Sequence, residues 1–218
     1  MINYIVNFGD SWAHAVSAKS EVTKTDGYSY LMAKDLGFQW LDYSITSSSS
    51  GRLVLQLQDF LKSKYDPSND YIALFFVTAQ ERQLMFDENE NPVEVHPQSH
   101  AEYYKKYYTD KLGNHNLNTT LIALQSMCNM YNIDDHYLLG WQLPTLWPEV
   151  DTNKFYDYGC SCAINMFAGP GANLTDMMTA SDPHLISNVD GHPNKRGHQV
   201  IKNEWLRWIR QRHPKLDQ

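Results

Sequence analysis

Short apolar runs alternate along the chain with longer segments whose apolar residues recur at helical spacing. Four runs predict β-strands, at residues 2–7, 38–43, 70–78 and 137–141. The run at 70–78 is almost continuously apolar, which is typical of a central parallel strand that helices cover on both faces. The hydrophobic pattern therefore predicts a sheet whose central strand is buried.

Apolar residues at intervals of three and four predict helices at residues 28–37, 53–61, 119–131 and 195–212. The first of these ends at Gly37, as expected of a helix closed by glycine, and the second ends before Pro67. Strands that alternate with helices predict an α/β fold, in which helices cover both faces of a parallel sheet. Since no linker rich in Pro or Gly divides the chain, we expect one domain over residues 1–218.

One segment, at about residues 84–118, interrupts this alternation. It is polar and carries four closely spaced tyrosines: Tyr103, Tyr104, Tyr107 and Tyr108. Long segments without regular structure are uncommon in compact domains unless they form functional loops or lids. The tyrosines suit either a platform for stacking sugars or packing along an amphipathic helix, and packing is our expectation. Whether the insertion is a mobile lid or a rigid excursion stays open.

Composition excludes several classes of protein. The 218 residues include 18 Lys and Arg against 25 Asp and Glu, a net charge of −7, which argues against binding to nucleic acids or anionic membranes. The apolar runs are too short to span a bilayer and no signal peptide is visible, so we expect a cytoplasmic or phage-associated protein. The three cysteines suit free thiols. The nine histidines form no familiar ligand pattern, so neither a metal nor a cofactor is expected.

Residues with chemical potential follow the predicted strands, at the end of the sheet where ligands bind in α/β folds. Ser11 comes directly after the first strand, within the tripeptide Gly-Asp-Ser. A serine hydroxyl is a poor nucleophile unless a base activates it, usually a histidine held by a carboxylate. Asp190 and His192, just before the last helix, provide such a pair. Each motif alone also suits an ordinary turn or helix cap, so their combination is what indicates catalysis.

The two motifs together resemble a known family. Residues 7–12 (NFGDSW) resemble the first block of the SGNH/GDSL hydrolases, and residues 189–194 (VDGHPN) with Gly197-His198 resemble the last block. These hydrolases are esterases and lipases, so the resemblance implies a flavodoxin-like, three-layer α/β/α sandwich with a parallel sheet of about five strands. It also implies that Ser11 is the nucleophile, His192 the general base and Asp190 the orienting acid, with no cofactor.

The acid is the first departure from the family's pattern. The family has Asp three residues before the histidine, where this chain has Val189, and Asp190 lies only two residues before it. Asp190 would then hold the imidazole from a different angle. Asp182 or a backbone carbonyl in its place, or a dyad without an acid, are alternatives that the sequence leaves open.

Two further departures concern the oxyanion hole, to which the resemblance assigns the amide of Ser11 and donors from the second and third blocks. Residues 45–52 (ITSSSSGR) correspond to the second block, where Gly51 or, in another register, Ser48 supplies a backbone amide. In the third block Gln80 takes the position of the family's asparagine and offers the same amide donor on a longer side chain.

Together these residues predict a serine esterase that hydrolyses carboxylic esters, with short acyl groups such as O-acetyl on carbohydrates as substrates. Thr78, Arg82 and Trp141 are the candidate substrate-binding residues. The altered blocks also suit a non-catalytic glycan-binding or virion-type structural module that keeps the fold, and the histidines leave a metal-dependent hydrolase as a third hypothesis. We expect no nucleic-acid or membrane partner, and the oligomeric state stays open.

Overall fold

The computed structural model describes residues 3–15, 22–141, 143–157, 162–169, 177–178, 180, 182–187 and 190–217. Six strands occur in this part of the chain: β1 (Asn3–Phe8), β2 (Gln39–Asp42), β3 (Asp70–Val77), β4 (Gln83–Phe86), β5 (Pro92–Val95) and β6 (Asp134–Leu139). The α-helices are α1 (Ser11–His14), α2 (Tyr28–Leu36), α3 (Arg52–Ser63), α4 (Ala101–Lys106), α5 (Asp110–Met130), α6 (Ala163–Ala168) and α8 (Lys195–Arg212). Short 3₁₀ helices cover Lys24–Asp26, Thr152–Lys154 and Pro214–Asp217.

The central sheet is parallel and has the strand order β2-β1-β3-β6. Strand β3 lies inside the sheet and is buried from Tyr71 to Val77, as its apolar run predicts. The expected count of about five strands is too high for the described residues. At the edge of the sheet Phe155 forms only an isolated parallel bridge with Tyr137, because a 3₁₀ helix ends directly before Phe155 and a turn with positive φ at Asp157 follows it.

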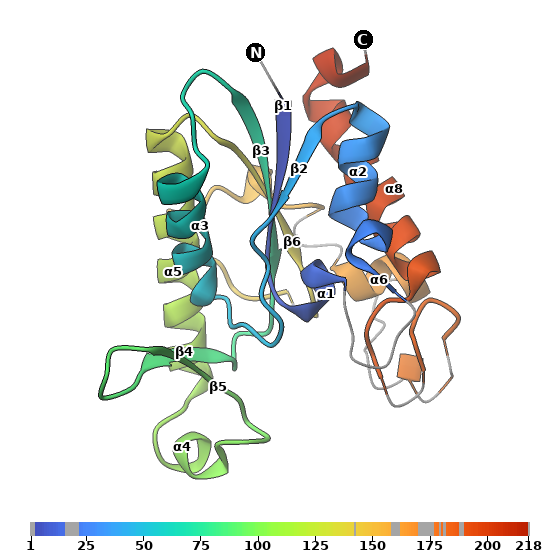
Figure 1. The fold of residues 1–218 in the computed structure, drawn as a ribbon. Coiled ribbons are helices and arrows are strands. Elements are labelled where there is room, and N and C mark those ends of the chain that lie inside the picture. The colour runs from blue at the N-terminus through green and yellow to red at the C-terminus, as the bar shows by residue number, and fades with distance from the viewer. Residues whose placement is uncertain are drawn as a thin grey trace.

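Helices cover both faces of this sheet, and the expected α/β/α arrangement is confirmed (Figure 1). Helices α3 and α5 pack together on one face, and α2, α6 and α8 lie on the other. Each long helix turns an apolar stripe inward, as Leu53, Leu57 and Phe60 do on α3. No helix in the described part of the chain is both long and apolar enough to cross a bilayer.

The segment at 84–118 is more ordered than the sequence predicts. Strands β4 and β5 form an antiparallel hairpin, α4 follows, and α5 begins at Asp110 rather than at residue 119. The hydroxyl of Thr109 accepts a hydrogen bond from the Leu112 amide at 3.1 Å and so caps α5. The first turns of α5 are helical although they are polar, because a side-chain cap such as that of Thr109 stabilises a helix start without any apolar residue.

The four tyrosines do not form the expected buried face of an amphipathic helix, since α4 buries no residue, but Tyr104 and Tyr108 turn their hydroxyl groups inward. The Tyr104 hydroxyl donates to the carbonyls of Val95, at 2.8 Å, and of Glu81, and burial raises the pKa of Tyr104 to about 12. The Tyr108 hydroxyl is buried against Gly113, where a Cβ would lie 2.3 Å from it. Two of these contacts lie within the insertion, and the contact with Glu81 joins it to the segment that follows β3. Cys128 and Cys162 are buried free thiols, as expected, and Cys160 lies outside the described residues.

Candidate active site

Ser11 lies at the carboxyl end of β1 because the chain makes a sharp turn at Gly9. The φ angle of Gly9 is +154°, and a Cβ there would lie 2.5 Å from the Ala13 Cβ and 2.9 Å from the Phe76 Cβ. Only glycine fits a backbone that approaches its neighbours so closely. Asp10 then caps α1 by accepting the Trp12 amide at 2.9 Å, and this makes Ser11 the first helical residue.

Two side chains hold this turn in place: Gln56, which the sequence analysis did not single out, and Ser48, which it considered only as a donor of a backbone amide. The side-chain amide of Gln56 accepts from the Gly9 N–H at 2.9 Å and donates to the Gly9 carbonyl at 3.0 Å. The Ser48 hydroxyl donates to the same carbonyl at 2.9 Å. Gln56 is buried on the apolar face of α3. A polar residue on that face is the signal that could have identified it.

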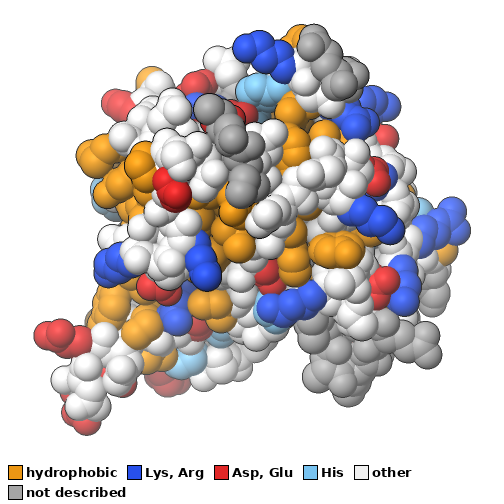
Figure 2. Space-filling model, turned by 45° about the horizontal axis from the view of Figure 1, so that its top comes forward, with side chains coloured by type: hydrophobic (Ala, Val, Ile, Leu, Met, Phe, Trp, Pro, Cys, Tyr) orange, Lys and Arg blue, Asp and Glu red, His pale blue; other side chains and the backbone are white. Residues whose placement is uncertain are grey.

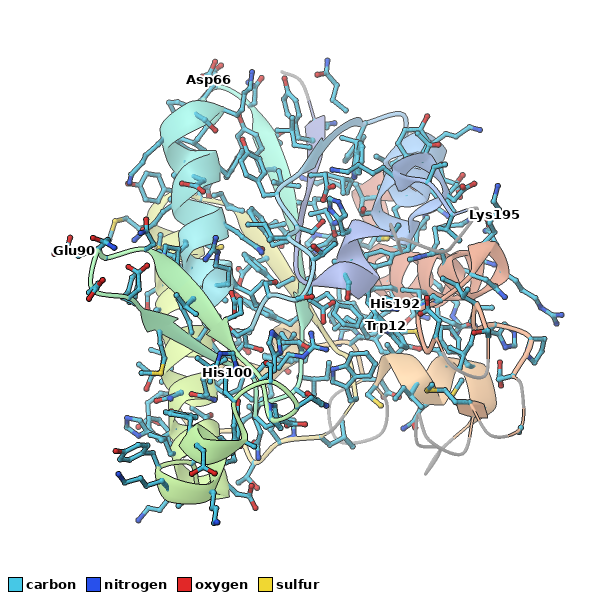
Figure 3. All side chains as sticks on the ribbon, turned by 60° about the horizontal axis from the view of Figure 1, so that its bottom comes forward. Trp12, Asp66, Glu90, His100, His192 and Lys195 are labelled. Carbon is cyan, nitrogen blue, oxygen red and sulfur yellow. The ribbon has the colours of Figure 1, made fainter. Side chains whose placement is uncertain are left out.

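His192 and Asp190 meet Ser11 from the other end of the chain. The His192 Nε2 lies 2.8 Å from the Ser11 Oγ, and its Nδ1 lies 2.5 Å from the Asp190 Oδ1. Figure 3 shows His192 beside Trp12, the neighbour of Ser11. Asp182, the alternative acid, instead contacts the Nδ1 of His184 at 2.8 Å. The structure thus joins Ser11, His192 and Asp190 in one hydrogen-bonded chain, while Val189 lies outside the described residues.

The loop that carries the histidine is fixed by the residues that follow it. The Asn194 side chain donates to the carbonyls of Pro183 and Leu185, both at 2.8 Å, and accepts from the Gly197 amide at 3.0 Å, which caps α8. A Cβ on Gly197 would lie 2.4 Å from the His184 carbonyl oxygen. Asn194 and Gly197 therefore permit the close approach of α8 to this loop. His198 is buried and its ring packs against Tyr28 of α2.

Arg82 and Thr78 contact the acid beside the serine. The Arg82 guanidinium lies 3.1 Å from Asp10, whose side chain is fully buried. Burial raises the pKa of Asp10, and Arg82 opposes this rise. Thr78 is only 5 % exposed, and its hydroxyl accepts from the Trp141 indole at 3.2 Å. Thr78 and Arg82, both expected near substrate, thus support the residues around Ser11.

The aromatic wall beside Ser11 consists of two tryptophans. The rings of Trp12 and Trp141 meet edge to face, with their centroids 4.4 Å apart. Trp12 is 1 % exposed, whereas Trp141 is partly exposed. Of this pair, Trp141 is therefore the one whose ring can contact a ligand.

The candidate oxyanion donors divide into two groups. The Ser48 amide donates to the Ile45 carbonyl at 3.3 Å, whereas the amides of Ser11 and Gly51 have no hydrogen-bond acceptor among the described residues. Gly51 and Gln80 line one open pocket of about 300 Å³ together with Arg82, and neither Ser11 nor His192 is among its described lining residues. Gly51 and Gln80 thus lie close to each other, with Arg82 between this pocket and the serine turn.

A buried carboxylate stabilises the far side of the turn. Asp42, at the end of β2, accepts from the Asn7 side chain at 3.0 Å and from the Lys24 ammonium at 3.0 Å, and His14 lies 3.5 Å away. Burial acts to raise the pKa of Asp42, but hydrogen bonds from His14, Ser44, Lys24 and Asn7 outweigh it and hold the pKa at about 2. The Asp42 carboxylate is therefore ionised and links β1, β2 and α1.

Solved structures resemble this chain, although no protein-family model and no curated protein matches its sequence. A catalytic mutant of Axe2, an acetylxylan esterase from Geobacillus stearothermophilus, matches with a TM-score of 0.54 at 14% identity over 95% of this chain and 94% of its own. TesA matches with a TM-score of 0.54 at 12% identity over 96% of this chain and 98% of its own. Est2A, an acetyl xylan esterase from Butyrivibrio proteoclasticus, matches with a TM-score of 0.54 at 13% identity over 98% of this chain and 64% of its own.

At such low identity these similarities establish the fold. The chain has the fold of the SGNH/GDSL hydrolases, as the two sequence blocks predict.

Proposed function

We propose that this protein is a serine esterase that hydrolyses carboxylic esters. The observation that carries this proposal is the continuous hydrogen-bonded chain from Ser11 through His192 to Asp190, with contacts of 2.8 and 2.5 Å. Three residues from two distant parts of the sequence meet in the order that general-base activation of a serine requires. The similarity to esterases of the same fold supports the proposal.

The chemistry follows from the roles of the two ring nitrogens. As the Ser11 oxygen forms a bond to the ester carbonyl carbon, its proton passes to the His192 Nε2, and Asp190 stabilises the imidazolium through Nδ1. The imidazolium then gives this proton to the leaving alcohol as the C–O bond breaks, which leaves an acyl-enzyme. A water molecule attacks the acyl carbon with the same histidine as base, and the carboxylic acid leaves as Ser11 regains its proton.

The developing oxyanion needs donors beside the serine. The Ser11 amide is one, since the first amides of a helix have no intrahelical acceptor. Gly51 and Gln80 are the further donors in this proposal, and Gly51 is preferred over Ser48 because the Ser48 amide already has an acceptor. Each such donor is worth about 2.7–4 kcal/mol in the transition state.

We further propose that the substrates are short acyl esters, with O-acetyl groups on carbohydrates as the first class to test. Two of the structures with the same fold are acetylxylan esterases. Exposed aromatic rings that suit a sugar are present on the insertion, where the Tyr107 side chain is 59 % exposed. Trp141 provides a second aromatic surface next to the serine turn.

Hydrolysis of p-nitrophenyl acetate, with a chelator present, tests the esterase proposal. We expect Ser11→Ala to reduce kcat/KM to the background rate and Ser63→Ala, at the far end of α3, to leave it unchanged. Labelling by an organophosphonate should likewise require Ser11 and be lost in His192→Ala. If the wild-type protein neither hydrolyses the ester nor reacts with the phosphonate, the proposal fails and the non-catalytic module takes its place.

A further inference from the structure

A cluster of metal-ligating side chains lies away from Ser11, at the amino end of β6. The Asp134 Oδ2 is 3.2 Å from the His136 Nε2 and 3.2 Å from the His213 Nε2. Among the described residues these three side chains hold their ligand atoms within 4.8 Å of one another. Since Ser11 follows the carboxyl end of β1 in a parallel sheet, the cluster and the candidate active site lie at opposite ends (Figure 1).

The local structure explains why these residues meet. Asp134 and His136 are separated by two positions on a strand, so their side chains project from the same face of the sheet, whereas Asp135 projects from the other. Asp135 accordingly binds Lys154, at 2.6 Å. His213 caps the C-terminal end of α8, the helix that covers the first face. One strand and one helix end thus supply a carboxylate and two imidazoles to a single point.

His136 is the feature that points to a ligand. Its side chain is only 4 % exposed, and neither of its ring nitrogens makes a hydrogen bond within the described part of the chain. Its Nε2 has only the 3.2 Å contact with Asp134, and the edge-to-face ring of Trp208 fixes its orientation. A buried imidazole without a hydrogen bond is costly, and a metal ion bound at Nε2 would remove part of that cost.

We propose that Asp134, His136 and His213 form a binding site for a divalent transition metal ion, with Zn²⁺ the best match. Two imidazoles and one carboxylate are ordinary zinc ligands, with metal–ligand distances of roughly 2.0–2.2 Å. In a tetrahedral site with such bonds the ligand atoms lie about 3.3 Å apart. The two contacts of 3.2 Å to Asp134 are close to this spacing, and the ligand atoms of the two histidines lie within 4.8 Å of each other. The fourth position faces outward, where Asp134 and His213 are 40 % and 34 % exposed.

The charges around the cluster agree with this assignment. Of the nearby cations, Lys154 is paired with Asp135, and Arg212 lies over the Trp208 ring at 3.8 Å. Figure 2, with this end of the molecule turned forward, shows basic and acidic side chains interspersed.

The bound ion would act on stability and not on ester hydrolysis. It would join the first residue of β6 to the end of α8, two elements far apart in the sequence. A ligand that binds only the folded state stabilises it by mass action. Zinc at about a hundred times its Kd should raise Tm by about 5–10 °C in a chain of this length.

The test is a titration of the full-length, chelator-treated protein with Zn²⁺ by calorimetry, and with Co²⁺ by visible absorption. We expect one equivalent to bind with micromolar or tighter affinity, and Co²⁺ to give the strong absorption bands of a four- or five-coordinate site. The accessible ligands are changed in His213→Gln and Asp134→Asn, which should each weaken binding at least about tenfold and abolish the rise in Tm. The control is His115→Gln, an exposed histidine of α5 that contacts Trp147.

Three results would overturn the proposal: no binding of either ion at one equivalent, binding that His213→Gln leaves unchanged, or binding that His115→Gln weakens as much. Circular dichroism of each variant establishes that it folds before it is titrated. Because the site is remote from Ser11, p-nitrophenyl acetate hydrolysis should not respond to chelation. The metal site and the esterase proposal can therefore fail independently.

Discussion

Replacement of Asp190 by Asn tests the least expected part of the proposed catalytic machinery. The Asp190 Oδ1 lies 2.5 Å from the His192 Nδ1 and accepts the His192 amide at 3.1 Å. Asparagine has nearly the same shape, so it keeps a hydrogen-bonding side chain in the loop. It removes the negative charge that orients and stabilises the imidazolium.

The size of the effect follows from how exposed the pair is. In the serine-protease example, where the aspartate is buried, the equivalent change lowers kcat by about 10⁴. Here the side chains of Asp190 and His192 are 16 % and 33 % exposed, so water replaces part of the lost interaction. We therefore expect kcat/KM to fall by about 10²–10³, which is about 2.7–4.1 kcal/mol in the barrier.

The chain contains a matched control for this change. Asp182 and His184 have the same spacing, and the Asp182 Oδ1 lies 2.8 Å from the His184 Nδ1 with both side chains 14 % exposed. Both variants are assayed by p-nitrophenyl acetate hydrolysis from pH 6 to 9, with Tm measured in parallel. Asp182→Asn should alter Tm about as much as Asp190→Asn while leaving kcat/KM within about twofold of wild type. If Asp190→Asn also stays within tenfold, or Asp182→Asn loses as much activity, Asp190 is not the orienting acid.

Three further predictions concern stability, each measured by urea unfolding. Arg82→Met should cost about 2–3 kcal/mol at pH 7 because it leaves the buried Asp10 carboxylate unpaired. Burial raises the folded pKa of Asp10 above 3.8, so protonation relieves this cost as pH falls, and a loss that does not shrink below pH 5 would contradict the pairing. Gly9→Ala should lower the free energy of unfolding by about 2–3 kcal/mol, because the added Cβ would overlap Ala13 and Phe76. Gly37 also has positive φ but open space around it, so Gly37→Ala should cost only about 1 kcal/mol. Equal losses in the two variants would contradict the steric explanation. Asp42→Asn should cost about 2 kcal/mol at pH 7, since the folded pKa of about 2 lies below the unfolded value of 3.8. That contribution is present above pH 3.8 and is lost as pH falls through about 2, so a gap between variant and wild type that stays constant from pH 5 to 2 would refute it.

Local periodicity was sufficient to identify most of the regular elements. The final helix has the predicted bounds, and α2 ends at Gly37, whose positive φ of 69° is the conformation that glycine adopts easily. Both helices bury one face, so the spacing of their apolar residues predicts that face directly. The first turns of α5 were missed because their polar residues do not show that spacing.

The residues of the candidate site also fall into two groups: those that local motifs predict and those that only the tertiary structure places. The pairing of Ser11 with His192 was predicted from short motifs, because a strand-to-helix turn and a capped loop impose specific residues at specific positions. The choice between Asp190 and Asp182 needed the structure, since both precede a histidine by two positions and only the path of the loop decides which histidine faces the serine. The role of Gln56 also needed it, because its partner Gly9 lies on another element.

The sequence by itself determined the alternation of strands and helices, the turn at Gly9 and the identity of the two end motifs, because each depends on neighbours along the chain. Only the tertiary structure decided which distant residues meet. The strand order β2-β1-β3-β6 and the packing of α8 on the sheet bring Ser11 to His192 at one end and His136 to His213 at the other. No spacing in the sequence encodes these meetings, because they result from how buried faces of separate elements pack together.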